Sequence, residues 1–230
     1  MSSVSVVVPA SSSDPTVDRV VDSLLQQTYP GPVEIILVGD VDPGGARFVR
    51  APAWAPSDTK RNLGLEAATG DVLCMVDGDV VPARDWVETG VALLNAGWSC
   101  AAGPVASVDA GFWGAYVDGN AFARMGHEYV ASRATLGRQG HKPPATANLF
   151  VAAELYERVG GLRPERGEGE WFQRIVDAGY PILCTPRLVA YHHRHQGWGR
   201  LPADPDHAGR ARQQIPRELG AIRFTRRRVC

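Results

Sequence analysis

The 230-residue sequence is short of lysine, of closely spaced cysteines and of long apolar runs. Lys60 and Lys142 are its only lysines, and the net charge of −1 gives no overall field that would attract nucleic acid. No stretch approaches the roughly 18 apolar residues that span a bilayer, and residues 1–9 lack the basic and long apolar regions of a signal peptide. We therefore expect a soluble, cytoplasmic protein with no nucleic-acid partner.

Paired cysteines and a glycine-rich fingerprint are also missing. The sequence contains no Cys-x-x-Cys pair, which argues against a zinc or redox site. Three of the four cysteines lie in apolar segments, so we expect buried free thiols in a reducing compartment. No Gly-x-Gly-x-x-Gly pattern follows the first apolar run, which argues against a dinucleotide-binding oxidoreductase. The cysteines are Cys74, Cys100, Cys184 and Cys230.

Apolar strand-like runs alternate with amphipathic helical segments in the first half of the chain. This alternation implies crossover connections and an α/β fold with a mostly parallel central sheet flanked by helices. Ligands of such sheets bind at the carboxyl ends of the strands. The expected strands are 4–8, 33–38, 72–76 and 99–102, and the expected helices are 58–68, 83–95 and one that begins at Pro15 with Asp14 as its N-cap.

The periodicity loosens after Gly103. The segment up to Pro144 contains one helical stretch, around 113–125, and then a polar loop. Residues 182–185 and 188–192 read as two strands that could pair with each other around Pro186. The remaining expected elements are a strand at 146–152 and helices at 153–159 and 168–178.

The most informative motif is Asp77-Gly78-Asp79. Three Asp-x-Asp pairs occur, but only this one directly follows a buried apolar strand, Val72–Val76. A divalent cation needs oxygen ligands, and one held by one or two carboxylates takes its remaining ligands from water or a diphosphate. This context predicts a metal and phosphate site at the end of the strand.

Residues 3–200 resemble the family 2 glycosyltransferases, which have the GT-A fold. The order and spacing of several blocks carry this resemblance. They are VSVVVP at 4–9, SLLQQTYP at 23–30, EIILVGD at 34–40, KRNLGLEAATGD at 60–71, DGD at 77–79, VGGL at 159–162, GEGEW at 167–171 and AGY at 178–180.

The resemblance implies a nucleotide-diphosphate sugar donor, a Mn²⁺ or Mg²⁺ cofactor and inverting transfer to an acceptor hydroxyl. Asp79 matches the direct metal ligand, and Asp77 would reach either the ribose or, through a water molecule, the metal. A histidine after the last strand, with His192 ahead of His193 and His195, would help to hold the metal or the diphosphate; the alternative is that the cluster is a solvated loop. The implied donor-binding residues are Pro9, Ser11, Asp40, Arg61, Asp77 and Gly78.

The resemblance also implies a carboxylate base, which we expect to be Glu168. Family members often have two adjacent acids here, whereas this chain has Gly167-Glu168 with Glu170 two residues later. The choice between Glu168 and Glu170 therefore stays open at the level of sequence. Gly39 is a second departure, since the family commonly has an acid beside Asp40.

In domain terms, the resemblance makes residues 1–103 a nucleotide-sugar-binding half and 104–200 an acceptor-binding, catalytic half of one domain. The Arg-rich tail, 201–230, could be a solvated surface, a diphosphate contact or a weak contact with the inner face of the membrane. The acceptor could be a saccharide, a lipid-linked molecule, a natural product or a peptide. The alternatives to an enzyme of this kind are a catalytically silent sugar-nucleotide-binding protein or assembly partner, and a nucleotidyltransferase.

Overall fold

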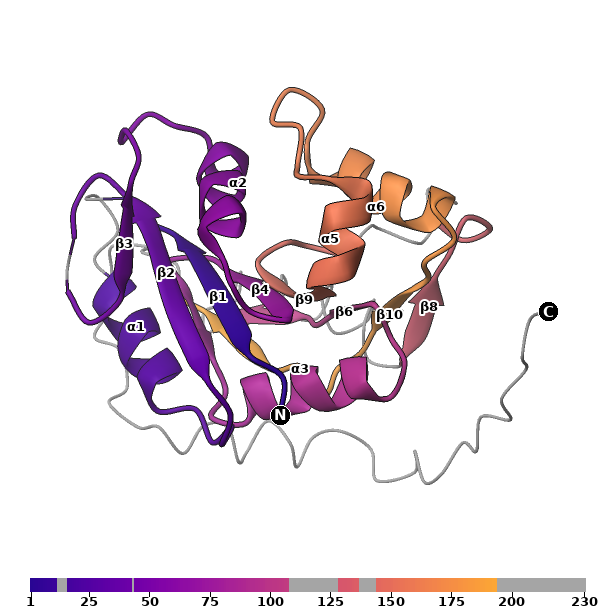
Figure 1. Ribbon diagram of the computed structural model, residues 1–230, viewed down its shortest axis with the longest axis horizontal. Helices are drawn as coiled ribbons and strands as arrows, with labels where there is room; N and C mark the ends of the chain where they lie inside the picture. Colours follow the sequence, from indigo (N-terminus) through magenta and orange to yellow (C-terminus); the bar gives the residue numbers. More distant parts are fainter. Residues whose placement is uncertain (12–15, 43, 108–127, 137–143, 194–230) are drawn as a thin grey trace. The chain divides into compact units, whose positions relative to one another are not determined.

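The computed structural model describes residues 1–11, 16–42, 44–107, 128–136 and 144–193 (Figure 1). These residues belong to one compact unit, Met1–Gln196, whereas a second unit, Gly197–Cys230, lies outside the described residues. Several expectations from the sequence fall outside them too. These are the helix around 113–125, the cap residue Asp14, His195 and the arginine-rich tail.

An eight-stranded sheet forms the centre of the described unit. Its strands are β1 (Val4–Pro9), β2 (Val33–Gly39), β3 (Arg47–Arg50), β4 (Val72–Val76), β6 (Cys100–Ala102), β8 (Tyr129–Ala131), β9 (Asn148–Ala152) and β10 (Ile182–Cys184). Their order is β3-β2-β1-β4-β9-β6-β10-β8. β3, β2, β1 and β4 are parallel, β9 is antiparallel to both of its neighbours, and β8 is antiparallel to β10. The expected mostly parallel α/β sheet is therefore confirmed.

Helices cover both faces of this sheet (Figure 1). α1 (Val17–Leu25) and α3 (Trp86–Asn95) lie on one face, and α2 (Ser57–Ala67), α5 (Ala153–Val159) and α6 (Glu168–Asp177) lie on the other. β1 and β4 are buried along their whole length, because both of their faces are covered.

The alternation of side chains along β1 divides the interior into two cores. Val6 and Val8 pack with α1 and α3, whereas Val7 packs on the opposite face with α2. Gly64 lets α2 lie close to this strand, since a Cβ at that position would be 2.3 Å from Cγ1 of Val7. This close packing sets the first turns of α2 over the carboxyl end of β1.

A second, three-stranded sheet corrects one expectation. Its strands, in the order β5-β11-β7, are β5 (Val80–Pro82), β11 (Ala190–His192) and β7 (Val105–Ser107). The expected pairing of 182–185 with 188–192 is wrong, because β10 lies between β6 and β8 while β11 joins the small sheet. Ile182–Cys184 is fully buried and needs neighbours on both sides, which a single hairpin partner cannot supply. The strands β3, β5, β7 and β8 were not expected from the sequence.

The described cysteines are buried free thiols, as expected. Burial raises the pKa of the Cys74 and Cys100 thiols well above the ordinary value, and raises the pKa of Cys184 to about 11. These thiols therefore stay protonated and unreactive at neutral pH. Among the described residues, no helix is long and apolar enough to cross a membrane.

Candidate active site

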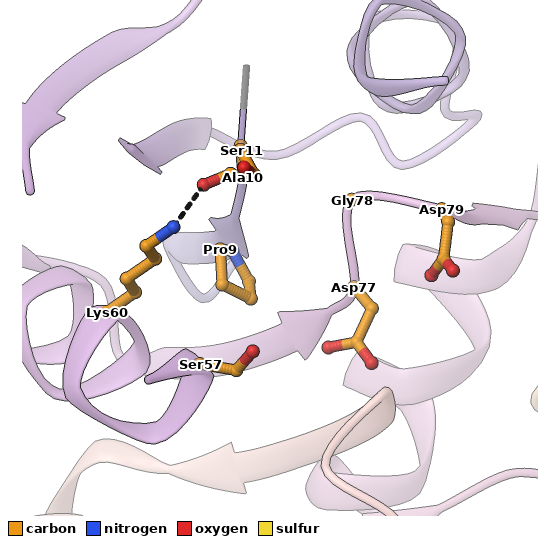
Figure 2. A pocket seen from close by; sticks show the side chains of 8 residues that line it. All are labelled: Pro9, Ala10, Ser11, Ser57, Lys60, Asp77, Gly78 and Asp79. Carbon is orange, nitrogen blue, oxygen red and sulfur yellow. Dashed lines mark hydrogen bonds between the residues drawn. The ribbon is translucent and has the colours of Figure 1, made fainter. Parts of the chain in front are cut away.

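The carboxyl ends of β1 and β4 open into a pocket of about 230 Å³ (Figure 2). The two strands are parallel neighbours, so the residues that follow them emerge at the same edge of the sheet. The first turn of α2 closes a third side. The lining residues are Pro9, Ala10, Ser11, Ser57, Lys60, Asp77, Gly78 and Asp79. The structure thus brings together five of the residues that the sequence assigned to the donor or the metal: Pro9, Ser11, Asp77, Gly78 and Asp79.

Asp79 contacts a residue from a distant part of the chain. Its Oδ2 lies 2.7 Å from Nε2 of His192, and its backbone carbonyl accepts a hydrogen bond of 2.8 Å from the backbone N–H of His193. The register of the small sheet creates this contact, because β11 pairs with β5 so that His192 lies opposite Val80. The expected pairing of Asp79 and His192 in one site therefore has a structural basis in the strand that follows Asp79.

Asp77 is held by Arg61. The Arg61 guanidinium bonds to Oδ1 of Asp77 and donates a second hydrogen bond, of 2.7 Å, to Oδ1 of Asp58. Burial raises the pKa of Asp77 above its usual value; Arg61 opposes this effect, and the charges of Asp79 and Glu168 reinforce it. Burial lowers the pKa of Arg61, but Asp77 and Asp58 outweigh it and the net pKa is raised. Arg61 thus neutralises and orients a carboxylate that is costly to ionise.

Lys60 is a pocket residue that sequence reasoning missed. It is only 4% exposed, and its Nζ donates a hydrogen bond of 2.7 Å to the carbonyl of Ala10. Figure 2 shows this ammonium reaching across the pocket from α2 to the end of β1. Ser57 lies one turn before Lys60 on the same helical face, at i and i+3. That spacing, together with the scarcity of lysine, was the signal that could have found it.

Glu168 begins α6 and is fixed by one buried residue. Its Oε2 accepts hydrogen bonds from the backbone N–H of Thr146, at 2.9 Å, and from the hydroxyl of Thr146, at 2.7 Å. Its negative charge is one of the causes that raise the pKa of Asp77, so the two carboxylates are electrostatic neighbours. Glu168 is not among the described residues that line the pocket, and its link to the pocket is this electrostatic effect on Asp77.

Glu170 has a different environment. Its carboxylate lies 3.0 Å from Nη1 of Arg163 and 3.0 Å from Nε of Arg174. Arg174 also donates to the carbonyls of Val159 and Gly161, which tie α6 to the end of α5. Glu170 is thus part of an ion-pair network that holds the α5–α6 connection. The spacing of the two acids in the sequence could not distinguish their environments, whereas the structure gives them different hydrogen-bond and ion-pair partners.

Asp40 stands apart from the pocket-lining group. It directly follows β2, and its backbone carbonyl accepts a hydrogen bond of 3.4 Å from Nη1 of Arg50. It is not among the described residues that line the pocket, although β2 and β1 are neighbours. Gly39 lies against β1, since a Cβ there would be 3.0 Å from the carbonyl oxygen of Ala10. A side chain at position 39 would therefore fit only if the Ala10 backbone shifted by a few tenths of an ångström.

The residues present suit a divalent cation whose remaining coordination positions would be filled by a bound ligand. In the part of the chain that the structure describes, no group of three or more His, Cys, Asp or Glu side chains forms a metal cluster by itself. Asp79 and His192 supply one carboxylate and one imidazole at adjacent positions. Mg²⁺ and similar ions are commonly held by one or two protein groups plus substrate phosphates, and imidazole is an acceptable ligand for several transition metals.

Comparison with known proteins agrees with this architecture. Residues 57–145 match the sequence profile described as Glycosyl transferase family 2. Glycosyltransferase AglE of Haloferax volcanii is 24% identical over 208 residues, which cover 82% of this chain and 66% of AglE. This chain therefore spans slightly less than two thirds of the length of that relative.

Solved structures show the same fold. The mannosyltransferase PcManGT from Pyrobaculum calidifontis, in complex with GDP-Man and Mn²⁺, aligns with a TM-score of 0.63 at 18% identity, over 92% of this chain and 61% of its own. TarS of S. aureus aligns with a TM-score of 0.60 at 14% identity, over 84% of this chain and 37% of its own. The sequence motifs, the profile matched over residues 57–145 and these folds agree: the chain has the GT-A fold and is similar in sequence to the family 2 glycosyltransferases.

Proposed function

We propose that the protein is a metal-dependent, inverting glycosyltransferase that moves a sugar from a nucleotide-diphosphate donor to an acceptor hydroxyl. The observation that carries the proposal is the contact of 2.7 Å between Asp79 and His192, beside a pocket that Asp77 and Lys60 also line. A carboxylate, an imidazole and a buried ammonium at one sheet edge suit a metal-bound diphosphate.

The relatives support a sugar nucleotide as the donor. PcManGT is in complex with GDP-Man and Mn²⁺, and a fragment of TarS, residues 1–349 of that protein, is in complex with UDP-GlcNAc at a TM-score of 0.56 to this chain. In our proposal, Pro9, Ser11 and Asp40 contact the nucleoside, and Lys60 and Arg61 contribute positive charge beside it. Residues 1–103 then form the donor half and 104–200 the acceptor half of the domain.

Asp79 and His192 would hold the cation, with Asp77 nearby. When bound, the cation would neutralise the charge that develops on the departing diphosphate oxygens. Arg61 orients Asp77 and favours its ionised form against the cost of burial. These residues therefore prepare the leaving-group side of the site.

Glu168 is the proposed base on the acceptor side. Thr146 occupies Oε2, and no hydrogen bond to Oε1 is found among the described residues, so Oε1 can accept the proton of the acceptor hydroxyl. As that proton moves to Glu168, the acceptor oxygen bonds to the anomeric carbon and the bond to the diphosphate oxygen breaks. Attack from the face opposite the leaving group inverts the anomeric configuration.

The direct test is a panel of UDP-, GDP- and dTDP-sugars, incubated with the protein and Mn²⁺ or with EDTA. Release of the nucleoside diphosphate is measured with water alone and with saccharide and lipid-linked acceptors. We expect release from donors of one base only, with Mn²⁺ only, and a product anomer opposite to that of the donor by NMR. Metal-dependent binding without turnover on any acceptor would instead favour the silent sugar-nucleotide binder.

A further inference from the structure

We infer that Thr146 is a positioning residue for the base, so that its hydroxyl and its backbone N–H aim one oxygen of Glu168 at the acceptor. This inference rests on the proposed function, because it assigns Thr146 a part in the same reaction. It adds a residue that neither the sequence motifs nor the matched profile, which ends at residue 145, identified.

Both donors of Thr146 converge on a single carboxylate oxygen. The N–H lies 2.9 Å and the hydroxyl 2.7 Å from Oε2 of Glu168, so the carboxylate is held at two points. A carboxylate held at one oxygen presents the other in a defined direction. Hydrogen bonds to an ionised acceptor are also stronger than neutral ones, so they hold the carboxylate in place more firmly.

Thr146 is itself rigidly supported. It is 1% exposed and lies two residues before Asn148, which begins β9. The Asn148 side chain accepts a hydrogen bond of 2.7 Å from Trp86 Nε1 and donates to the carbonyls of Pro104, at 2.8 Å, and Leu188, at 2.9 Å. The support of Glu168 therefore comes from the sheet, whereas its own backbone belongs to α6.

Other charged groups close to Glu168 have partners of their own. Asp77, at the end of β4, is paired with Arg61 of α2, and Glu170 on α6 is paired with Arg163 and Arg174. Within the described residues, Thr146 is the only group with a hydrogen bond to the Glu168 carboxylate. The orientation of that carboxylate therefore depends on Thr146.

The first measurement needs no turnover. The backbone amide of Thr146 is followed by ¹H–¹⁵N NMR in the wild-type protein and in Glu168→Gln. We expect its proton resonance to move upfield in the variant, because a charged acceptor is replaced by a neutral one. An amide that does not respond to Glu168→Gln overturns the contact and with it the proposal, whatever the activity.

The second measurement is turnover of the donor that passes the sugar-nucleotide panel. We expect Thr146→Val to lower kcat by about tenfold with KM for the donor unchanged, because it deletes one of the two charged hydrogen bonds and keeps the shape. Thr146→Ser keeps the hydroxyl and should restore kcat. In a Glu168→Gln background, Thr146→Val should have no further effect, since Thr146 acts only through Glu168.

The outcomes distinguish a failure of the role proposed for Thr146 from a failure of the proposed function. If Thr146→Ser loses as much activity as Thr146→Val, or if KM rises and thermal stability falls together with the loss of kcat, the residue is structural and the proposal is wrong. If the amide responds but the wild-type protein turns over no sugar nucleotide, the proposed function fails and the contact has no positioning role.

Discussion

Asp79 and His192 are 113 residues apart in the sequence, yet their side chains meet at 2.7 Å. The strand after Asp79 pairs with the strand that ends at His192, and the backbone of His193 bonds to the carbonyl of Asp79. The small sheet therefore fixes a carboxylate and an imidazole side by side before any ligand arrives. Such preorganisation reduces the ordering that a metal-bound diphosphate would otherwise require.

This pair predicts metal-dependent nucleotide binding. In calorimetric titrations of UDP, GDP and dTDP, we expect one nucleotide to bind with Mn²⁺ and to lose its affinity with EDTA. Asp79→Asn and His192→Ala should each weaken that binding by roughly tenfold or more. The control is Asp22→Asn, which changes an exposed acid on α1. Equal binding by all three variants would rule out the proposed metal ligands.

Substitutions of the two acids of α6, Glu168 and Glu170, should affect different properties, the first turnover and the second stability. Glu168→Gln should lower turnover by roughly 10²–10⁴-fold and leave nucleotide affinity near that of the wild type, since a base acts on the acceptor and not on the donor. Glu170→Gln should instead lower the melting temperature, because it breaks ion pairs to Arg163 and Arg174. The reverse pattern, with turnover lost only in Glu170→Gln, would make Glu170 the base.

Lys60 should contribute to nucleotide affinity. Lys60→Met removes a buried positive charge from the pocket and its hydrogen bond to Ala10, so we expect the affinity for the nucleoside diphosphate to fall by about tenfold. Arg19→Met, on an exposed position of α1, is the matched control for loss of one positive charge. Calorimetry at two salt concentrations measures the effect, and an unchanged affinity in Lys60→Met would remove this residue from the donor site.

Glu34 predicts a pH dependence of stability. Burial raises the pKa of Glu34, but hydrogen bonds from Ser5 and Thr69 outweigh it and the net pKa is lowered. A carboxylate with a lowered folded-state pKa stabilises the protein above its unfolded-state pKa, and this contribution disappears as the pH falls through the folded-state value. Glu34→Gln should therefore cost about 1 kcal/mol or less at pH 7, because the group is partly exposed, and the cost should vanish in acid.

Urea unfolding at neutral and acidic pH measures the Glu34 effect. Glu157→Gln is the control, because Glu157 is an exposed acid on α5. A stability difference between Glu34→Gln and the wild type that persists unchanged at low pH would show that the hydrogen bonds do not depend on ionisation.

Asn148 should be among the costliest polar residues to replace. Its side chain is fully buried and bonds to Trp86, Pro104 and Leu188, so Asn148→Leu leaves two carbonyls and one indole N–H without partners. We expect a loss of about 2–4 kcal/mol in the free energy of unfolding. Trp86→Phe removes only one of these bonds, and urea unfolding should rank it as milder than Asn148→Leu. If both variants lose the same free energy of unfolding, the destabilisation comes from the packing of Trp86 and not from the hydrogen bonds of Asn148.

Much of the fold was predictable from the sequence because its signals are local. The β-branched run at Val4–Pro9 and the apolar run at Val72–Val76 are both buried strands, and their alternation with amphipathic helices gave the parallel arrangement. The same logic placed Pro9, Asp77 and Asp79 at one sheet edge, since parallel strands end together. The short strands β3, β5, β7 and β8, by contrast, were not predicted, because three or four residues are too few for a distinctive pattern.

The sequence by itself determined which segments are buried, in which order they alternate, and that an Asp-Gly-Asp follows a buried strand. The tertiary structure alone decided that β11 joins β5, that Lys60 points into the pocket, and that Thr146 holds Glu168 while Arg163 and Arg174 hold Glu170. The physical reason is the range of the forces involved. Periodic burial is written into neighbouring residues, whereas hydrogen bonds and ion pairs between distant segments form only when the whole core has packed.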